Sequence, residues 1–219
     1  MPTTSKALDL RCYVVTAAGD PRDIVSTAAA ASRGGAGVVQ VRSKPISARD
    51  LCSLAEAVAE AVQPATTVLI DDRIDVAQAL RHRGVRIDGV HIGQVDLDPR
   101  DARAVLGQDA VIGLTTGTLE LVEDANTYED VIDYIGCGPF RATPTKASGR
   151  PLIGVEGYPA LVAASKLPMV AIGDVTADDA SALAATGVDG LAVVRGFSQA
   201  ADPEDYARRL IAGFEEGRR

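Results

Sequence analysis

Short runs rich in β-branched residues alternate along the chain with alanine-rich stretches of helical period. The runs are Cys12–Thr16, Val38–Arg42, Val68–Asp71, Gly89–Ile92, Val111–Leu114, Tyr134–Cys137, Met169–Ile172 and Leu191–Val194. They are almost continuously apolar, as expected for parallel strands buried on both faces. The intervening stretches predict helices at Asp23–Arg33, Ala48–Val62, Ile74–Arg83, Pro99–Leu106, Leu119–Asn126, Tyr158–Ala164, Ala177–Ala185 and Pro203–Glu216. Strand–helix units of roughly 27 residues favour a closed (β/α)8 TIM barrel, with an open doubly wound sheet as the alternative.

The 219 residues suit one domain of this kind. We expect a single TIM-barrel domain over residues 1–219, with residues 1–9 as an N-terminal extension. The longest irregular stretch, Gly138–Val155, exceeds a simple strand–helix turn. Loops of that length in a compact domain are often functional.

The charge balance argues against nucleic acid as a partner. The formal net charge is −8, whereas a nucleic-acid-binding domain usually carries a basic surface. No apolar run approaches the roughly 20 residues that span a bilayer. Residues 1–6 lack the basic and apolar parts of a secretory signal. We therefore expect a cytoplasmic protein that binds neither nucleic acid nor a membrane, and its oligomeric state stays open.

The active sites of TIM barrels lie at the carboxyl ends of the strands. Residues near the predicted ends of the second to eighth strands are, in order, Gln40, Arg42 and Lys44; Asp71 and Asp72; His91 and Asp96; Thr115; Thr143, Thr145 and Lys146; Gly173 and Asp174; and Val194 and Arg195. Their shared position at one mouth makes them the candidate site.

These side chains bring together cations, carboxylates and hydroxyls. Arg42, Lys44 and Lys146 supply positive charge for phosphate groups, arginine through a planar fork and lysine as a point charge. Asp72 and Asp96 are oxygen ligands on adjacent strands. Mg²⁺ is typically held by one or two carboxylates together with substrate phosphate oxygens. The pattern predicts a diphosphate site with Mg²⁺ as cofactor.

Each of these residues also has a simpler interpretation. Arg42 and Lys44 would suit a solvated strand end. Asp72 precedes a helix and would suit its N-cap. Asp96 would suit an ordinary turn, and His91 a structural histidine among apolar neighbours. Their joint placement at successive strand ends favours the functional interpretation.

Several segments resemble thiamine-phosphate synthases in order and spacing. They are Val39–Lys44, Ile70–Arg73, Gly89–Asp96, Asp133–Pro139, Thr143–Lys146, Ala171–Gly173 and Gly190–Val194. The most specific are His91-x-Gly93-Gln94-x-Asp96 and Thr143-Pro144-Thr145-Lys146. The resemblance extends from about Tyr13 to about Val194, nearly the whole chain.

The resemblance implies a Mg²⁺-dependent transferase of thiamine biosynthesis. Such an enzyme joins an aminopyrimidine, hydroxymethylpyrimidine diphosphate, to hydroxyethylthiazole phosphate and releases diphosphate. The implied roles are pyrimidine contact for Gln40, with Asp71 and His91 in the same substrate site; diphosphate binding for Arg42, Lys44, Lys146 and Thr115; Mg²⁺ binding for Asp72 and Asp96; and thiazole phosphate binding for Thr143, Thr145, Gly173, Asp174, Val194 and Arg195.

This chain departs from the family pattern at four of these positions. The family usually has Asn at Asp71, Ser at Thr115, a second Gly at Asp174 and Ser at Arg195. A carboxylate near a bound phosphate repels it and a guanidinium attracts it, so these changes leave open an altered acceptor or a lost activity. The alternatives are a thiazole tautomerase-like isomerase and a non-catalytic protein that binds thiamine precursors.

Overall fold

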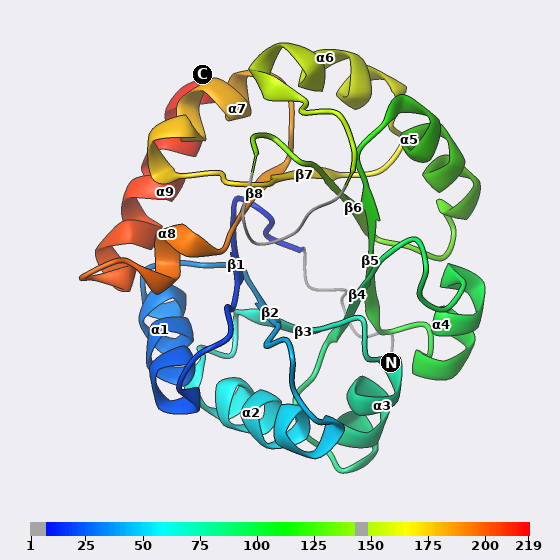
Figure 1. Cartoon of the computed structure of the whole chain (residues 1–219), viewed down its shortest axis with the longest axis vertical. Coiled ribbons are helices and arrows are strands. Elements are labelled where there is room, and N and C mark those ends of the chain that lie inside the picture. Colours follow the sequence, from blue (N-terminus) through cyan, green and yellow to red (C-terminus); the bar gives the residue numbers. More distant parts are fainter. Residues whose placement is uncertain (1–7, 143–148) are drawn as a thin grey trace.

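Eight parallel strands close into a barrel in which each strand pairs with the next along the chain. The structure, a computed structural model, describes residues 8–142 and 149–219. The strands are β1 (Cys12–Val15), β2 (Val38–Val41), β3 (Thr67–Asp71), β4 (Gly89–Ile92), β5 (Val111–Thr116), β6 (Tyr134–Cys137), β7 (Met169–Ile172) and β8 (Gly190–Val193). Pairing of β1 with β8 closes the barrel (Figure 1). The TIM-barrel prediction is confirmed, and the open sheet is excluded.

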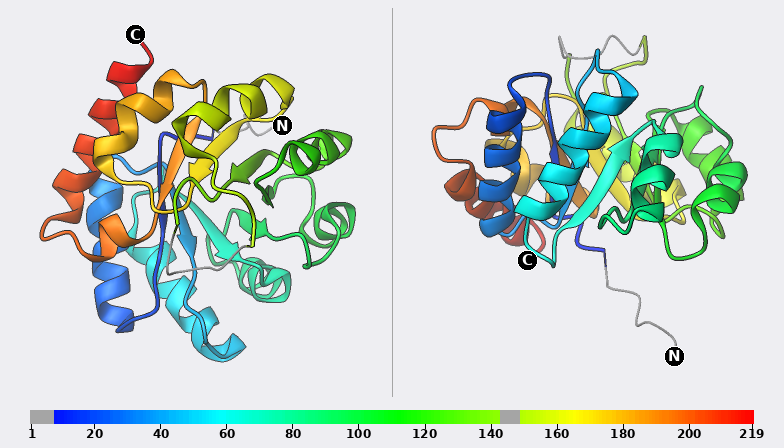
Figure 2. Two further views of the ribbon diagram at one scale, coloured as in Figure 1. Left: turned by 45° about the horizontal axis from the view of Figure 1, so that its top comes forward. Right: turned by 90° about the horizontal axis from the view of Figure 1, so that it is seen from below.

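Helices form a ring around the barrel (Figures 1 and 2). They are α1 (Pro21–Arg33), α2 (Ala48–Ala61), α3 (Ile74–His82), α4 (Pro99–Leu106), α5 (Leu119–Ala125), α6 (Gly154–Ala164), α7 (Ala180–Ala185), α8 (Arg195–Ser198) and α9 (Pro203–Gly217), with 3₁₀ turns η1 (Asn126–Tyr128) and η2 (Ala177–Asp179). All eight predicted helices are present, most within two residues of the expected bounds. The main differences are an earlier start of α6 and the unpredicted short helix α8.

Side chains alternate between the inside of the barrel and the helix layer, as the period of a strand requires. Val14, Val39 and Ile112 point outward and belong to the large core between barrel and helices. Tyr13 and Tyr134 belong to a separate inner cluster together with Leu10, Val15, Val38, Leu69, Val170 and Ala192. Polar residues at inward positions therefore lie inside the barrel rather than in solvent.

Gly113 of β5 makes room inside the barrel for two larger neighbours. It is in register with His91 of β4 on one side and Tyr134 of β6 on the other. A Cβ atom at this position would lie 2.2 Å from Tyr134 Cζ and 2.5 Å from His91 Nδ1. Because glycine has no side chain, His91 and Tyr134 can meet across the strand between them.

Candidate active site

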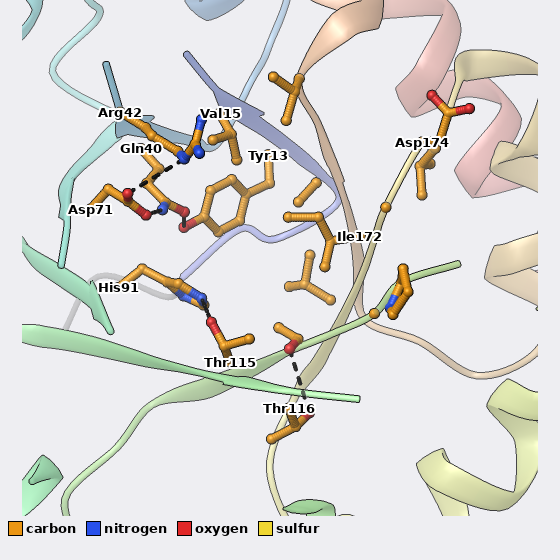
Figure 3. A pocket seen from close by; sticks show the side chains of 18 of the residues that line it. Tyr13, Val15, Gln40, Arg42, Asp71, His91, Thr115, Thr116, Ile172 and Asp174 are labelled. Carbon is orange, nitrogen blue, oxygen red and sulfur yellow. Dashed lines mark hydrogen bonds and ion pairs between the residues drawn. The ribbon is translucent and has the colours of Figure 1, made fainter. Parts of the chain in front are cut away.

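A pocket opens at the carboxyl ends of the strands (Figure 3). The sequence-predicted residues that line it are Gln40, Arg42, Asp71, His91, Thr115, Gly173, Asp174, Val194 and Arg195. Lys44, Asp72 and Asp96 lie beside this group and are joined to it by the interactions described below. Thr143, Thr145 and Lys146 lie outside the described residues. Every predicted site residue that the structure describes is therefore in or next to one pocket.

The Asp71 carboxylate is the centre of a charged cluster at the ends of β2 and β3. Gln40 Nε2 donates a hydrogen bond to Asp71 Oδ1 at 2.5 Å. The other oxygen, Oδ2, lies 3.1 Å from Lys44 Nζ and 3.5 Å from Arg42 Nε. Lys44 also pairs with Asp72. Arg42 thus pairs with one carboxylate and the half-exposed Lys44 with two.

Asp72 has a left-handed backbone conformation and does not cap α3. Its φ is 59°, a region that non-glycine residues seldom adopt and that is often found at functional sites. The N-cap of α3 is Arg73, with no side-chain cap. The capping interpretation of Asp72 is therefore wrong.

Burial and neighbouring charges shift the pKa values of this cluster. Burial raises the pKa of Asp71, and the Asp72 carboxylate raises it further, against the opposite effects of Lys44 and Arg42. Partial burial is also the main reason that the pKa of Asp96 is raised, with a smaller contribution from Asp72. Burial lowers the pKa of Lys44, but its bonds to Asp72 and Asp71 outweigh this and leave the pKa raised.

Asp72 and Asp96 come close together across the ends of β3 and β4. The Asp72 carboxylate is near enough to contribute to the raised pKa of Asp96, and Asp96 Oδ2 accepts a hydrogen bond from the Gly93 amide at 2.6 Å. Asp96 therefore has the turn contact that its sequence context suggests, and a second carboxylate beside it. Two like charges at this distance repel each other unless a cation lies near them.

The donor set has the composition that Mg²⁺ requires. Among the described residues, no group of three or more His, Cys, Asp or Glu side chains is placed to hold a metal. Asp72 and Asp96 offer carboxylate oxygens, and Asp71 Oδ2 beside them faces Lys44 and Arg42. One or two carboxylates completed by substrate oxygens is a usual arrangement for Mg²⁺.

Two tyrosines in the pocket wall were not identified from the sequence. Tyr13 and Tyr134 are completely buried and hydrogen-bond to each other at 2.7 Å, and Tyr13 also donates to Gln40 Oε1 at 2.6 Å. Strand alternation places both on the inner face, so their position was available as a signal. Arg150 also lines the pocket and donates to the Thr116 carbonyl at 2.9 Å; it follows a long loop and had no such signal.

The opposite side of the pocket carries a second ion pair. Arg195, the first residue of α8, pairs with Asp174 at the end of β7. Asp174 also has a φ of 59°, and Figure 3 shows it across the pocket from Asp71 and Arg42. The site therefore has two charged regions, one at β2–β4 and one at β7–β8, with an apolar wall that includes Val15 and Ile172 between them.

Comparisons with known proteins identify relatives over nearly the full length. Residues 12–197 match the family model described as thiamine monophosphate synthase. The chain is 65% identical over 210 residues to the thiamine-phosphate synthase of Corynebacterium efficiens, covering 96% of this chain and 97% of the relative. It is 66% identical over 215 residues to that of Corynebacterium jeikeium, covering 97% and 98%.

A solved structure agrees with these sequence matches. Thiamine phosphate pyrophosphorylase from Pyrococcus furiosus superposes with a TM-score of 0.81 at 30% sequence identity, over 97% of this chain and 98% of the other. In the described part of the chain, no helix combines the length and the apolar composition needed to cross a membrane.

Proposed function

Because this chain belongs to the thiamine monophosphate synthase family, we propose that it joins hydroxymethylpyrimidine diphosphate to hydroxyethylthiazole phosphate and releases diphosphate. The expectation of a thiamine-phosphate synthase, a transferase, is confirmed by the relatives that carry that name. The observation that best supports these substrates is the division of the pocket into two charged regions separated by an apolar wall. Two phosphorylated substrates that react at a methylene carbon between two rings need such a site.

The reaction makes a simple demand on the protein. The bond between the pyrimidine methylene carbon and a diphosphate oxygen breaks, the diphosphate keeps the electron pair, and the thiazole nitrogen then bonds to that carbon. No protein nucleophile is needed. The protein must stabilise charge on the leaving group and hold the acceptor in line. Arg42 and Lys44 have the charge and the position for the first task, and we assign Thr115 and Lys146 to it as well.

Asp72 and Asp96 are the residues that would hold Mg²⁺. Their proximity supports this assignment. When bound there, Mg²⁺ supplies positive charge to the leaving diphosphate. Lys44 pairs with both Asp71 and Asp72, so it lies beside the carboxylates that would hold the ion and is placed to contact a phosphate bound there.

The β7–β8 region suits the phosphate of the acceptor. Barrels often bind phosphate with the loops after these two strands and a short additional helix, and α8 is such a helix. Arg195 is the cation there. We assign it, with Gly173, Asp174 and Val194, to the thiazole phosphate, and Thr143 and Thr145 to the same substrate.

A turnover assay with both substrates tests the proposal. We expect thiamine phosphate and diphosphate in equal amounts when both substrates and Mg²⁺ are present, and neither product when one substrate is omitted. Isomerisation of a thiazole substrate alone would instead support the tautomerase. Binding of both substrates without product would support a non-catalytic homologue and overturn the proposal.

A further inference from the structure

A continuous series of hydrogen bonds crosses the inside of the barrel from β3 to β5. It joins Asp71, Gln40, Tyr13, Tyr134, His91 and Thr115 in that order. Tyr134 Oη lies 2.7 Å from Tyr13 Oη and 2.9 Å from His91 Nδ1, and His91 Nε2 lies 2.9 Å from Thr115 Oγ1. Figure 3 shows Asp71, Gln40, Tyr13, His91 and Thr115 on one side of the pocket. We call these six side chains the polar chain.

The direction of the first bond depends on the charge of Asp71. Lys44 and Arg42 lie beside its carboxylate and favour the ionised form, which can only accept hydrogen bonds. Gln40 must therefore direct its nitrogen to Asp71 and its oxygen to Tyr13. An asparagine at this position would have both donor and acceptor atoms and would impose no such direction.

This direction passes along the polar chain because each phenol has one hydrogen. The Tyr13 hydroxyl donates to Gln40 Oε1, so in its bond to Tyr134 it must accept. Tyr134 therefore donates its only hydroxyl hydrogen to Tyr13, and in its bond to His91 Nδ1 it must accept. The carboxylate of Asp71 thus determines that the proton of His91 lies on Nδ1, four hydrogen bonds away.

We propose that Asp71 is a positioning residue that sets the polarity of the polar chain and so fixes which atoms Gln40 presents to a bound ring. With its bonds to Asp71 and Tyr13 made, the Gln40 amide keeps one N–H and one oxygen lone pair. Gln40 lines the pocket with 4% of its surface exposed. A donor beside an acceptor matches a ring nitrogen beside an amino group.

The consequence is selectivity between an aminopyrimidine and the corresponding oxopyrimidine. Replacing the amino group by a carbonyl and protonating the adjacent nitrogen exchanges donor and acceptor, so the oxo ring meets like groups on a fixed Gln40. Discrimination is strong where a site leaves a buried polar group unpaired by the wrong substrate. A Gln40 free to rotate by 180° would match either ring. This part of the inference rests on the proposed function.

The protonation state of His91 can be measured without any ligand. The chain has two histidines, His82 and His91, so His82→Gln leaves a single imidazole for ¹⁵N NMR at a pH where it is neutral. We expect the Nδ1–H tautomer in this background. Asp71→Asn should give a mixture of tautomers, and Asp75→Asn, which removes a similar charge from an exposed ion pair, should not. An Nε2–H tautomer in the background protein, or an unchanged tautomer in Asp71→Asn, would overturn the proposal.

The selectivity is measured as the ratio of kcat/KM for the amino and oxo forms of the pyrimidine diphosphate. Both forms carry the same diphosphate, so a charge effect of Asp71 on that group cancels in the ratio. We expect Asp71→Asn to lower the ratio by about tenfold or more. Tyr134→Phe keeps the Asp71–Gln40–Tyr13 bonds and should leave the ratio unchanged while altering the His91 tautomer. An unchanged ratio in Asp71→Asn would overturn the selectivity. Absence of turnover with either form would count against the proposed function, while the NMR result would still decide the polarity.

Discussion

Asp174 has a backbone conformation typical of glycine and a side chain whose charge is unfavourable beside a phosphate. Its φ of 59° is a conformation that glycine adopts without cost and that aspartate tolerates better than most residues. Its carboxylate would repel a phosphate at this end of the pocket, and Arg195 pairs with it. The charges of Asp174 and Arg195 are therefore coupled.

Replacing Arg195 by serine should weaken binding of the acceptor phosphate. Asp174 would then face the phosphate without a cation, and a charge-assisted hydrogen bond would be lost, so we expect the acceptor KM to rise about tenfold or more. The KM for the pyrimidine diphosphate should change less, because that substrate is assigned to the other charged region. Steady-state kinetics with each substrate varied in turn checks this.

The double variant Asp174→Gly with Arg195→Ser should recover much of the loss, because residues in direct contact have coupled effects. Arg33→Ser removes a comparable ion pair on α1, distant from the pocket, and should leave both KM values unchanged. If Arg195→Ser alone binds the acceptor as well as the parent does, Arg195 is not a phosphate ligand.

Strand β5 supports the site through the absence of a side chain. Gly113 lets His91 and Tyr134 meet across β5. A side chain at this position would separate the histidine of β4 from the tyrosine of β6. The strand thus contributes to the pocket although it carries no functional group at this position.

Gly113→Ala should disrupt this contact. The added methyl would lie 2.2 Å from Tyr134 Cζ, and overpacking of this kind costs about 1–3 kcal/mol. We expect the melting temperature to fall by roughly 2–4 °C for each kcal/mol and the His91–Tyr134 hydrogen bond to be lost. Gly19→Ala is the matched control, because its Cβ would meet no atom within 4 Å. Equal melting temperatures for the two variants would contradict the packing argument.

We expect the carboxylates at the mouth to make the stability of the whole molecule depend on pH and Mg²⁺. The folded-state pKa values of Asp71 and Asp96 are raised above their ordinary value. At pH values between the ordinary and the raised pKa, the folded chain binds more protons than the unfolded chain, so stability falls as pH rises. The loss begins near the ordinary aspartate pKa of about 4 and is complete above the raised values.

Mg²⁺ should restore this stability at neutral pH and have little effect at low pH, where Asp96 is protonated. A cation present at ten times its Kd stabilises the folded form by about 1.4 kcal/mol. Thermal unfolding with and without Mg²⁺ across this pH range checks the prediction. Asp96→Asn should raise the melting temperature without Mg²⁺, remove the Mg²⁺ effect and lower turnover, whereas Asp130→Asn on the exposed surface should do none of these. An Asp96→Asn protein that Mg²⁺ still stabilises would refute the metal assignment.

The strand and helix pattern, the barrel class and the set of residues at its mouth follow from the sequence alone. Parallel strands buried on both faces are almost continuously apolar, so strands such as β2 and β7 can be recognised in the sequence as mainly apolar runs. The rule that barrel sites lie at carboxyl strand ends then selected residues such as Arg42 and Asp72, and the structure places them together.

Only the tertiary structure decided which of these side chains touch, and through what. The meeting of Asp72 with Asp96, the exclusion of Asp72 from the helix cap, and the pairing of Arg195 with Asp174 depend on strand register and backbone conformation. The polar chain depends on side chains from several strands, and Gly113, which has no side chain, lies between two of its members. Such contacts join residues far apart in the chain, and a linear pattern records which face a residue occupies but not what lies opposite it.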